Sequence, residues 1–229
     1  MIRYRRPMMH RRPVLALACA APLAAAPAAP AATLVTDSRC YQETQEVVLK
    51  GSGYTPLSTV TVTQDGEPLG TAQADADGAF QRKFPTSELP ANRPENVYTL
   101  AATDAVNSGT TRYRATKVFA DFSPGSGDPT RLRVRFNVFG FGLVRPRATV
   151  YLHYVRRSTG KVRRTIKLGR VRGTCGAIRQ TKLLKLFPFT PERGTWILQF
   201  DTVKRYERAT SRRTTPWVRK PVEVFTRRR

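Results

Sequence analysis

The clearest secondary-structure signal in this chain is the segment Thr59-Val60-Thr61-Val62-Thr63-Gln64-Asp65-Gly66. β-Branched residues alternate with a period of two, which places Val60 and Val62 on one face of a strand and the threonines on the other. Asp65-Gly66 then supplies the residue pair that favours a two-residue hairpin turn. We therefore expect a strand that is buried on one face and that leads into an antiparallel neighbour.

Short runs of the same kind lie on both sides of this segment. Val47-Val48-Leu49-Lys50 precedes it, and apolar or alternating runs follow at 69–74, 79–84, 97–102 and 111–119. Turn residues separate the runs, at the spacing that β-sandwiches show. The pattern predicts about seven short strands between residues 32 and 122.

Three turn motifs link these runs, and they are Gly51-Ser52-Gly53-Tyr54-Thr55-Pro56, Asp75-Ala76-Asp77-Gly78-Ala79-Phe80 and Ala102-Thr103-Asp104-Ala105-Val106-Asn107. Together they resemble the turns of Ig-like repeats in bacterial exported and surface proteins. The resemblance covers residues 33–122 and implies an Ig-like β-sandwich. It also implies a role as a spacer, an adhesion unit or a module that binds carbohydrate or protein.

The second half of the chain also follows strand periodicity. Arg131-Leu132-Arg133-Val134-Arg135-Phe136 alternates, so that the three arginines share one face and the apolar residues the other. Strand-like runs recur at 149–155, 163–168, 195–200 and 222–225. We expect a second sandwich with a longer loop around 170–179, while 180–187 fits either a short helix or a strand. The expected fold class is all-β, with two Ig-like β-sandwich domains in tandem.

Charge is divided unevenly along the chain, whose net charge is +24. Residues 32–130 carry a net charge of −4, whereas residues 131–229 hold 27 basic and 4 acidic residues. The step coincides with Ser123-Pro124-Gly125-Ser126-Gly127-Asp128-Pro129, a run typical of turns and linkers. The predicted domains are therefore 32–122 and 131–229, joined by a linker at 123–130, with an arginine-rich tail at the end.

The N-terminus has the layout of a secretory signal peptide. Residues 1–12 contain five arginines and no acid, an apolar run covers 14–26, and Ala29-Pro30-Ala31 offers a cleavage site. The apolar run is shorter than the roughly 20 residues that cross a bilayer. We expect a signal peptide over 1–31 and a protein that is secreted, extracellular or held in the cell envelope. Arg11-Arg12 leaves twin-arginine export open, and Cys19 leaves a lipid anchor open.

Two cysteines, Cys40 and Cys175, follow the expected signal peptide. In an oxidising compartment two such cysteines usually pair. A bridge between them closes a long loop, and chain entropy alone then stabilises the fold by about 4–5 kcal/mol. We expect this disulfide, with two unrelated thiols as the alternative.

The basic residues of the second half suggest what the protein binds. Arg131, Arg133 and Arg135, together with Arg163 and Lys167, are expected to form one basic face for a polyanion. Outside the cell this implies an anionic cell-wall polymer or an acidic glycan as partner. Peripheral contact with a membrane or envelope surface is a further possibility, and no specific nucleic acid is expected. The alternative is a solvated arginine-rich face without a ligand.

The sequence offers little for catalysis. His153 is the only histidine after the expected signal peptide, and it lies within a predicted strand. The loop 173–179 weakly resembles the nucleophile loop of L,D-transpeptidases but lacks their Ser-His-Gly. Asp75 and Asp77 lack the later Glu of an EF-hand loop, and no phosphate-binding or dinucleotide motif is present. We expect no enzymatic activity, no cofactor and no metal. A small-ligand carrier with an Ig-like cleft is the main alternative, and a wall-modifying enzyme is the third.

Overall fold

The computed structural model describes residues 32–143, 145–208 and 216–225, and within these ranges the chain forms strands and no helix. The all-β fold class is therefore confirmed. The expected signal peptide and the terminal arginines 227–229 lie outside the described residues. No helix long and apolar enough to cross a membrane occurs in the described ranges.

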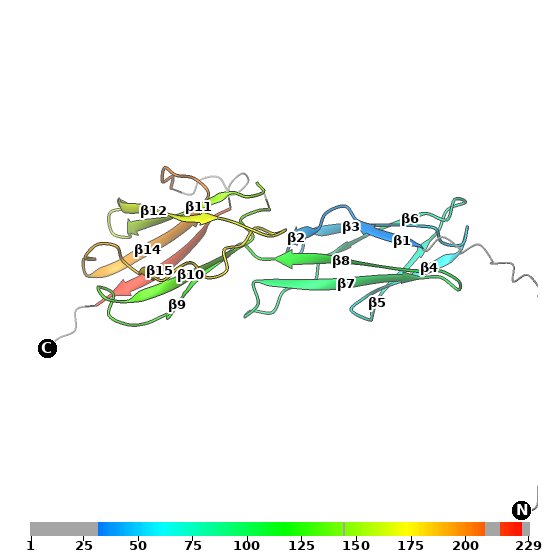
Figure 1. Ribbon diagram of the computed structural model, residues 1–229, viewed down its shortest axis with the longest axis horizontal. Coiled ribbons are helices and arrows are strands. Elements are labelled where there is room, and N and C mark those ends of the chain that lie inside the picture. Colours follow the sequence, from blue (N-terminus) through cyan, green and yellow to red (C-terminus); the bar gives the residue numbers. More distant parts are fainter. Residues whose placement is uncertain (1–31, 144, 209–215, 226–229) are drawn as a thin grey trace, which may run out of the picture. The chain divides into compact units, whose positions relative to one another are not determined.

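Eight strands, which we call the N-terminal sandwich, precede residue 117 (Figure 1). They are β1 (Thr33–Thr36), β2 (Cys40–Gln42), β3 (Glu46–Ser52), β4 (Thr59–Gln64), β5 (Glu67–Gln73), β6 (Phe80–Pro85), β7 (Glu95–Thr103) and β8 (Ser108–Thr116). One sheet has the order β1-β3-β6 and the other β2-β8-β7-β4-β5. A hydrophobic cluster lies between the two sheets, with Val47, Val60, Val62 and Leu100 fully buried.

The hairpin predicted at Asp65-Gly66 connects β4 to β5. Both turn residues have positive φ, 50° at Asp65 and 91° at Gly66, as a type I′ turn requires. Val60 and Val62 are buried, and the intervening threonines face outward or lie partly covered. The local sequence therefore specifies both the strand face and the turn.

The three turn motifs of the N-terminal sandwich meet at one place in the fold. The Tyr54 amide donates to the Gly78 carbonyl at 3.1 Å, and the Thr55 amide donates to Asp104 Oδ2 at 2.7 Å. A Cβ atom at Gly78 would lie 2.1 Å from the Tyr54 carbonyl oxygen, so only glycine fits this approach. The three motifs therefore have a structural role, because their residues hold the loops together.

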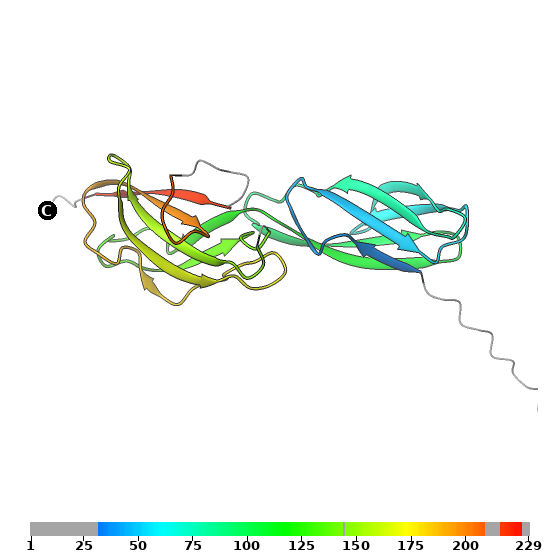
Figure 2. The same cartoon turned by 90° about the horizontal axis from the view of Figure 1, so that it is seen from above.

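The remaining seven strands form the C-terminal sandwich, whose layers can be followed in Figure 2. They are β9 (Phe119–Ser123), β10 (Arg133–Phe139), β11 (Thr149–Arg156), β12 (Val162–Arg170), β13 (Leu184–Lys185), β14 (Gly194–Asp201) and β15 (Val218–Val224). The sheets have the orders β13-β10-β9 and β12-β11-β14-β15. A second hydrophobic cluster, which includes Phe136, Leu152, Leu198 and Phe200, fills the space between them.

Both sandwiches share one strand order. Sheet β13-β10-β9 corresponds to β6-β3-β1, and β12-β11-β14-β15 corresponds to β5-β4-β7-β8. This is the Ig-like arrangement, with strands A, B and E in one sheet and C′, C, F and G in the other. In addition, β2 pairs in parallel with β8 at the edge of the N-terminal sandwich.

The run 123–130, which was expected as a linker, begins at the last residue of β9 and ends before β10. Residues 111–119 were expected as one strand, but β8 ends at Thr116 and β9 begins at Phe119. β9 pairs with β10, and its inward residue Phe122 packs against Phe136 of the second cluster at a ring distance of 6.0 Å. The Gly- and Pro-rich run therefore connects two strands of one sheet. Residues 31–229 form one compact unit, and the division into domains stays a prediction.

Segment 180–187, for which the sequence left helix or strand open, contains the two-residue strand β13. Thr181 fixes this segment to β10, because its amide donates to the Phe136 carbonyl at 2.9 Å. Its hydroxyl also accepts a hydrogen bond from the Phe136 amide at 3.0 Å. Long-range pairing with β10, rather than the pattern of 180–187, sets the strand.

Candidate anion-binding surface

The predicted arginine alternation is present at the start of β10. Val134 and Phe136 are fully buried, while Arg133 and Arg135 are exposed on the opposite face of the strand. Arg131 is also exposed and lies just before the strand. Strand geometry therefore separates the cations from the core, as the period of two predicts.

The five predicted cations do not share one face. Arg163 and Lys167 are exposed on β12, which belongs to the sheet opposite β10. The two sheets pack around one core, so their outer faces point away from each other. Alternation shows which side of a strand is exposed, but it does not show which sheet the strand joins.

The structure adds cations that the sequence analysis missed. β13 pairs antiparallel with β10, and Lys185 lies directly opposite Arg133. We define the β10–β13 basic face by the exposed residues Arg131, Arg133, Arg135, Lys182 and Lys185. Like charges directly opposite each other destabilise a strand pair. β13 is only two residues long, so its sequence shows no alternation from which the strand could be predicted.

Backbone carbonyls of the neighbouring segment orient two of these arginines. Arg135 Nη1 donates to the Thr181 carbonyl at 3.0 Å, and Arg133 Nη2 donates to the Leu183 carbonyl at 3.4 Å. These hydrogen bonds leave the positive charges unneutralised. On the adjacent strand, Asp121 forms an ion pair with Lys220 and not with the β10 arginines. The basic face therefore keeps its charge.

The outer face of the other sheet carries a buried polar network around His153, which is a packed strand residue as expected. Its Nδ1 lies 2.8 Å from Thr165 Oγ1, and its Nε2 lies 3.0 Å from Asp201 Oδ1. Gln199 Nε2 donates to Asp201 Oδ2 at 2.8 Å and to the Glu207 carbonyl at 3.2 Å. The network fastens the segment that follows β14 to the sheet.

The expected disulfide between Cys40 and Cys175 is present. The two Cα atoms are 5.3 Å apart, within the range that a disulfide spans. Cys40 begins β2, and Cys175 lies in the turn after β12. Within the described ranges, no cluster of His, Cys, Asp or Glu side chains could hold a metal ion.

No family model and no curated protein sequence matches this chain. Among solved structures, the human OSCAR ligand-binding domain is 13% identical, with coverage of 85% of this chain and 98% of that chain, at a TM-score of 0.33. The titin Ig tandem domains A164-A165 are 16% identical to this chain. The match covers 84% of this chain and 96% of that chain, at a TM-score of 0.29.

A third similar structure is Salmonella alpha-2-macroglobulin reacted with methylamine, at 14% identity and a TM-score of 0.31. The match covers 85% of this chain but spans only 15% of the macroglobulin. With TM-scores this low, the Ig-like assignment rests on the strand order of the two sandwiches.

Proposed function

We propose that this chain is an exported, non-catalytic binding or adhesion protein of the bacterial cell surface, and that it binds anionic polymers on the β10–β13 basic face. The observation that carries the proposal is the direct pairing of Arg133 with Lys185, flanked by Arg131 and Arg135. Two cations held opposite each other cost stability, and a bound anion offsets that cost.

The geometry of a strand suits an extended ligand. Residues two positions apart on one strand face recur about every 7 Å. A polymer with regularly spaced anionic groups therefore meets several cations at once, which a single small anion does not. The export signal expected at the N-terminus favours an anionic wall polymer or an acidic glycan over nucleic acid.

The test compares two variants of the full chain that lose equal charge. Arg131→Ser/Arg133→Ser/Arg135→Ser removes three cations from the basic face. The matched control, Lys161→Ser/Arg163→Ser/Lys167→Ser, removes three exposed cations from β12 and the turn before it. Teichoic acid and heparin serve as probes, with affinity measured at several salt concentrations.

We expect the β10 variant to lose affinity at least tenfold more than the control, with a shallower salt dependence. Removing one ion pair between protein and polymer lowers the slope of log affinity against log salt, by about 0.9 on duplex DNA. Melting temperatures no lower than that of the unmodified protein would show that the core face of β10 is intact. Equal losses of affinity in both variants would mean that net charge, and not this face, holds the polymer.

A further inference from the structure

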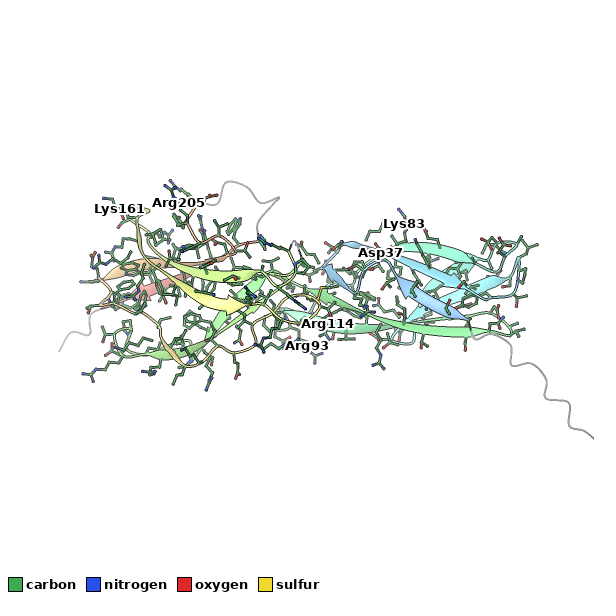
Figure 3. All side chains as sticks on the ribbon, turned by 45° about the horizontal axis from the view of Figure 1, so that its top comes forward. Asp37, Lys83, Arg93, Arg114, Lys161 and Arg205 are labelled. Carbon is green, nitrogen blue, oxygen red and sulfur yellow. A yellow bond between two sulfur atoms is a disulfide. The ribbon has the colours of Figure 1, made fainter. Side chains whose placement is uncertain are left out.

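A pocket of about 570 Å³ shares no lining residue with the β10–β13 basic face, and four arginines line it. They are Arg114, Arg170, Arg172 and Arg179, and Glu95 is the single acidic residue of the lining. Arg114, labelled in Figure 3, extends from β8. The volume is within the range of ligand pockets, roughly 300–1,000 Å³.

Glu95 orders two of these arginines. Its side chain is only 7% exposed, and both of its carboxylate oxygens are engaged. Arg114 Nη1 lies 2.6 Å from Oε1, and Arg179 Nη2 lies 2.6 Å from Oε2. A buried carboxylate with two guanidinium partners has no capacity left to neutralise the other cations.

Arg170 and Arg172 are the two arginines of the lining that form no ion pair with Glu95. Both are exposed, and their side chains form no hydrogen bond or ion pair with any residue that the structure describes. Arg170 ends β12, and Arg172 stands two residues further on. The lining therefore carries a net positive charge, and two guanidinium groups remain available to a ligand.

The backbone that carries Arg172 is held firmly. Arg172 and Ala177 exchange two backbone hydrogen bonds of 2.8 Å across a tight turn. Cys175 within that turn is bonded to Cys40. Gly176 packs so closely on Gly142 that a Cβ would lie 2.3 Å from its Cα atom. Because the backbone of this turn is already fixed, ligand binding has to order only the side chain of Arg172.

We infer that this four-arginine pocket binds a charge-dense oxyanion that carries phosphate groups. Guanidinium groups match phosphate oxygens with paired N–H donors, and all four cations of the lining are arginines. None of the described residues that line the pocket is aromatic, so the lining offers no ring on which a base can stack. The ligand is therefore compact and charged, either a free phosphate chain or the terminal phosphate of a larger molecule.

The experiment measures binding of tripolyphosphate to the full chain by calorimetry at constant ionic strength. Arg170→Ser/Arg172→Ser should weaken binding at least tenfold. The control Arg131→Ser/Arg133→Ser removes the same charge from the β10–β13 basic face and should bind within twofold of the unmodified protein. A control that loses as much as the pocket variant, or a pocket variant that binds normally, would overturn the inference.

Three probes separate the two sources of phosphate: inorganic phosphate, glycerol phosphate and tripolyphosphate. Tighter binding of tripolyphosphate than of the other two identifies a free phosphate chain as the ligand. Tighter binding of glycerol phosphate identifies a terminal phosphate. If none of the three binds the unmodified protein, the pocket is not a phosphate site, whatever the basic face binds.

Discussion

The imidazole Nε2 of His153 lies 3.0 Å from Asp201 Oδ1, and the side chains of both residues are at most 5% exposed. The Val203 carbonyl lies 3.1 Å from the same nitrogen, and the Val203 amide donates to Asp201 at 2.9 Å. One histidine on β11 and one aspartate at the end of β14 therefore hold the segment that follows β14.

Replacement of His153 by alanine should destabilise the protein. The substitution removes the hydrogen bonds of the imidazole to Asp201 and Thr165, each worth about 0.5–1.5 kcal/mol, and leaves a cavity in place of a fully buried ring. We expect a fall of about 2–4 kcal/mol in the free energy of unfolding, measured in urea. Lys161→Ala, at an exposed position, serves as the control and should stay within about 0.5 kcal/mol. If His153→Ala lowers the free energy of unfolding as little as Lys161→Ala does, the network does not contribute to stability.

Acid should weaken the N-terminal sandwich through Asp104. The backbone amides of Asn107 and Thr55, which donate to its carboxylate, hold the pKa of Asp104 below its ordinary value. Because the folded-state pKa is the lower one, the stabilisation is present above the unfolded value near 4 and is lost as the pH falls.

We therefore expect Asp104→Asn to lower the melting temperature at pH 7 and to reduce the further loss between pH 5 and pH 3. Asp77→Asn, in an exposed turn, is the matched control and should follow the unmodified protein. Parallel melting curves for Asp104→Asn and the unmodified protein across this pH range would argue against the assignment.

High pH should destabilise the protein through ionisation of Tyr41. Burial, together with the hydrogen bond from its hydroxyl to Asp37 at 2.7 Å, raises the pKa of Tyr41 to about 12. The folded value is above the unfolded value near 10, so this stabilisation is complete below pH 10 and is lost as the pH rises toward 12.

Tyr41→Phe keeps the ring that packs edge-on against Tyr113 at 5.5 Å and removes the hydroxyl. The hydroxyl also accepts a hydrogen bond from the Ser38 amide at 2.8 Å, so the variant loses two hydrogen bonds. It should lose about 1–3 kcal/mol at pH 7, since the usual net value of one hydrogen bond is about 0.5–1.5 kcal/mol. It should then lose less stability than the unmodified protein between pH 9 and pH 11. Thermal melts over this range measure the difference, and an equal alkaline loss would assign the effect to other tyrosines.

Two glycines with positive φ offer a matched pair of substitutions. Gly66 has open space where a Cβ would go, whereas a Cβ at Gly78 would collide with the Tyr54 carbonyl. Gly66→Ala should therefore cost only the strain of its φ, on the order of 1 kcal/mol. Gly78→Ala should cost clearly more in urea unfolding, and an equal cost would contradict the close approach of the two loops.

Features set by neighbouring residues could be read from the sequence. The alternation at Thr59–Gln64 and around Arg133 correctly assigned the buried and exposed faces, because side chains on a strand alternate whatever the strand pairs with. The turn at Asp65-Gly66 was likewise predictable, since it needs only positive φ at two residues. The pairing of Cys40 with Cys175 followed from their number and the expected export.

Features set by pairing between distant strands could not be read in this way. β9 pairs with β10, and Phe122 packs on Phe136, although all but the last residue of β9 precede the glycine- and proline-rich run. Lys185 faces Arg133, and Arg163 and Lys167 lie on the opposite sheet, only because of strand order. Local periodicity selects a side of each strand, whereas packing of the whole core selects the strand's neighbours and so places the cations.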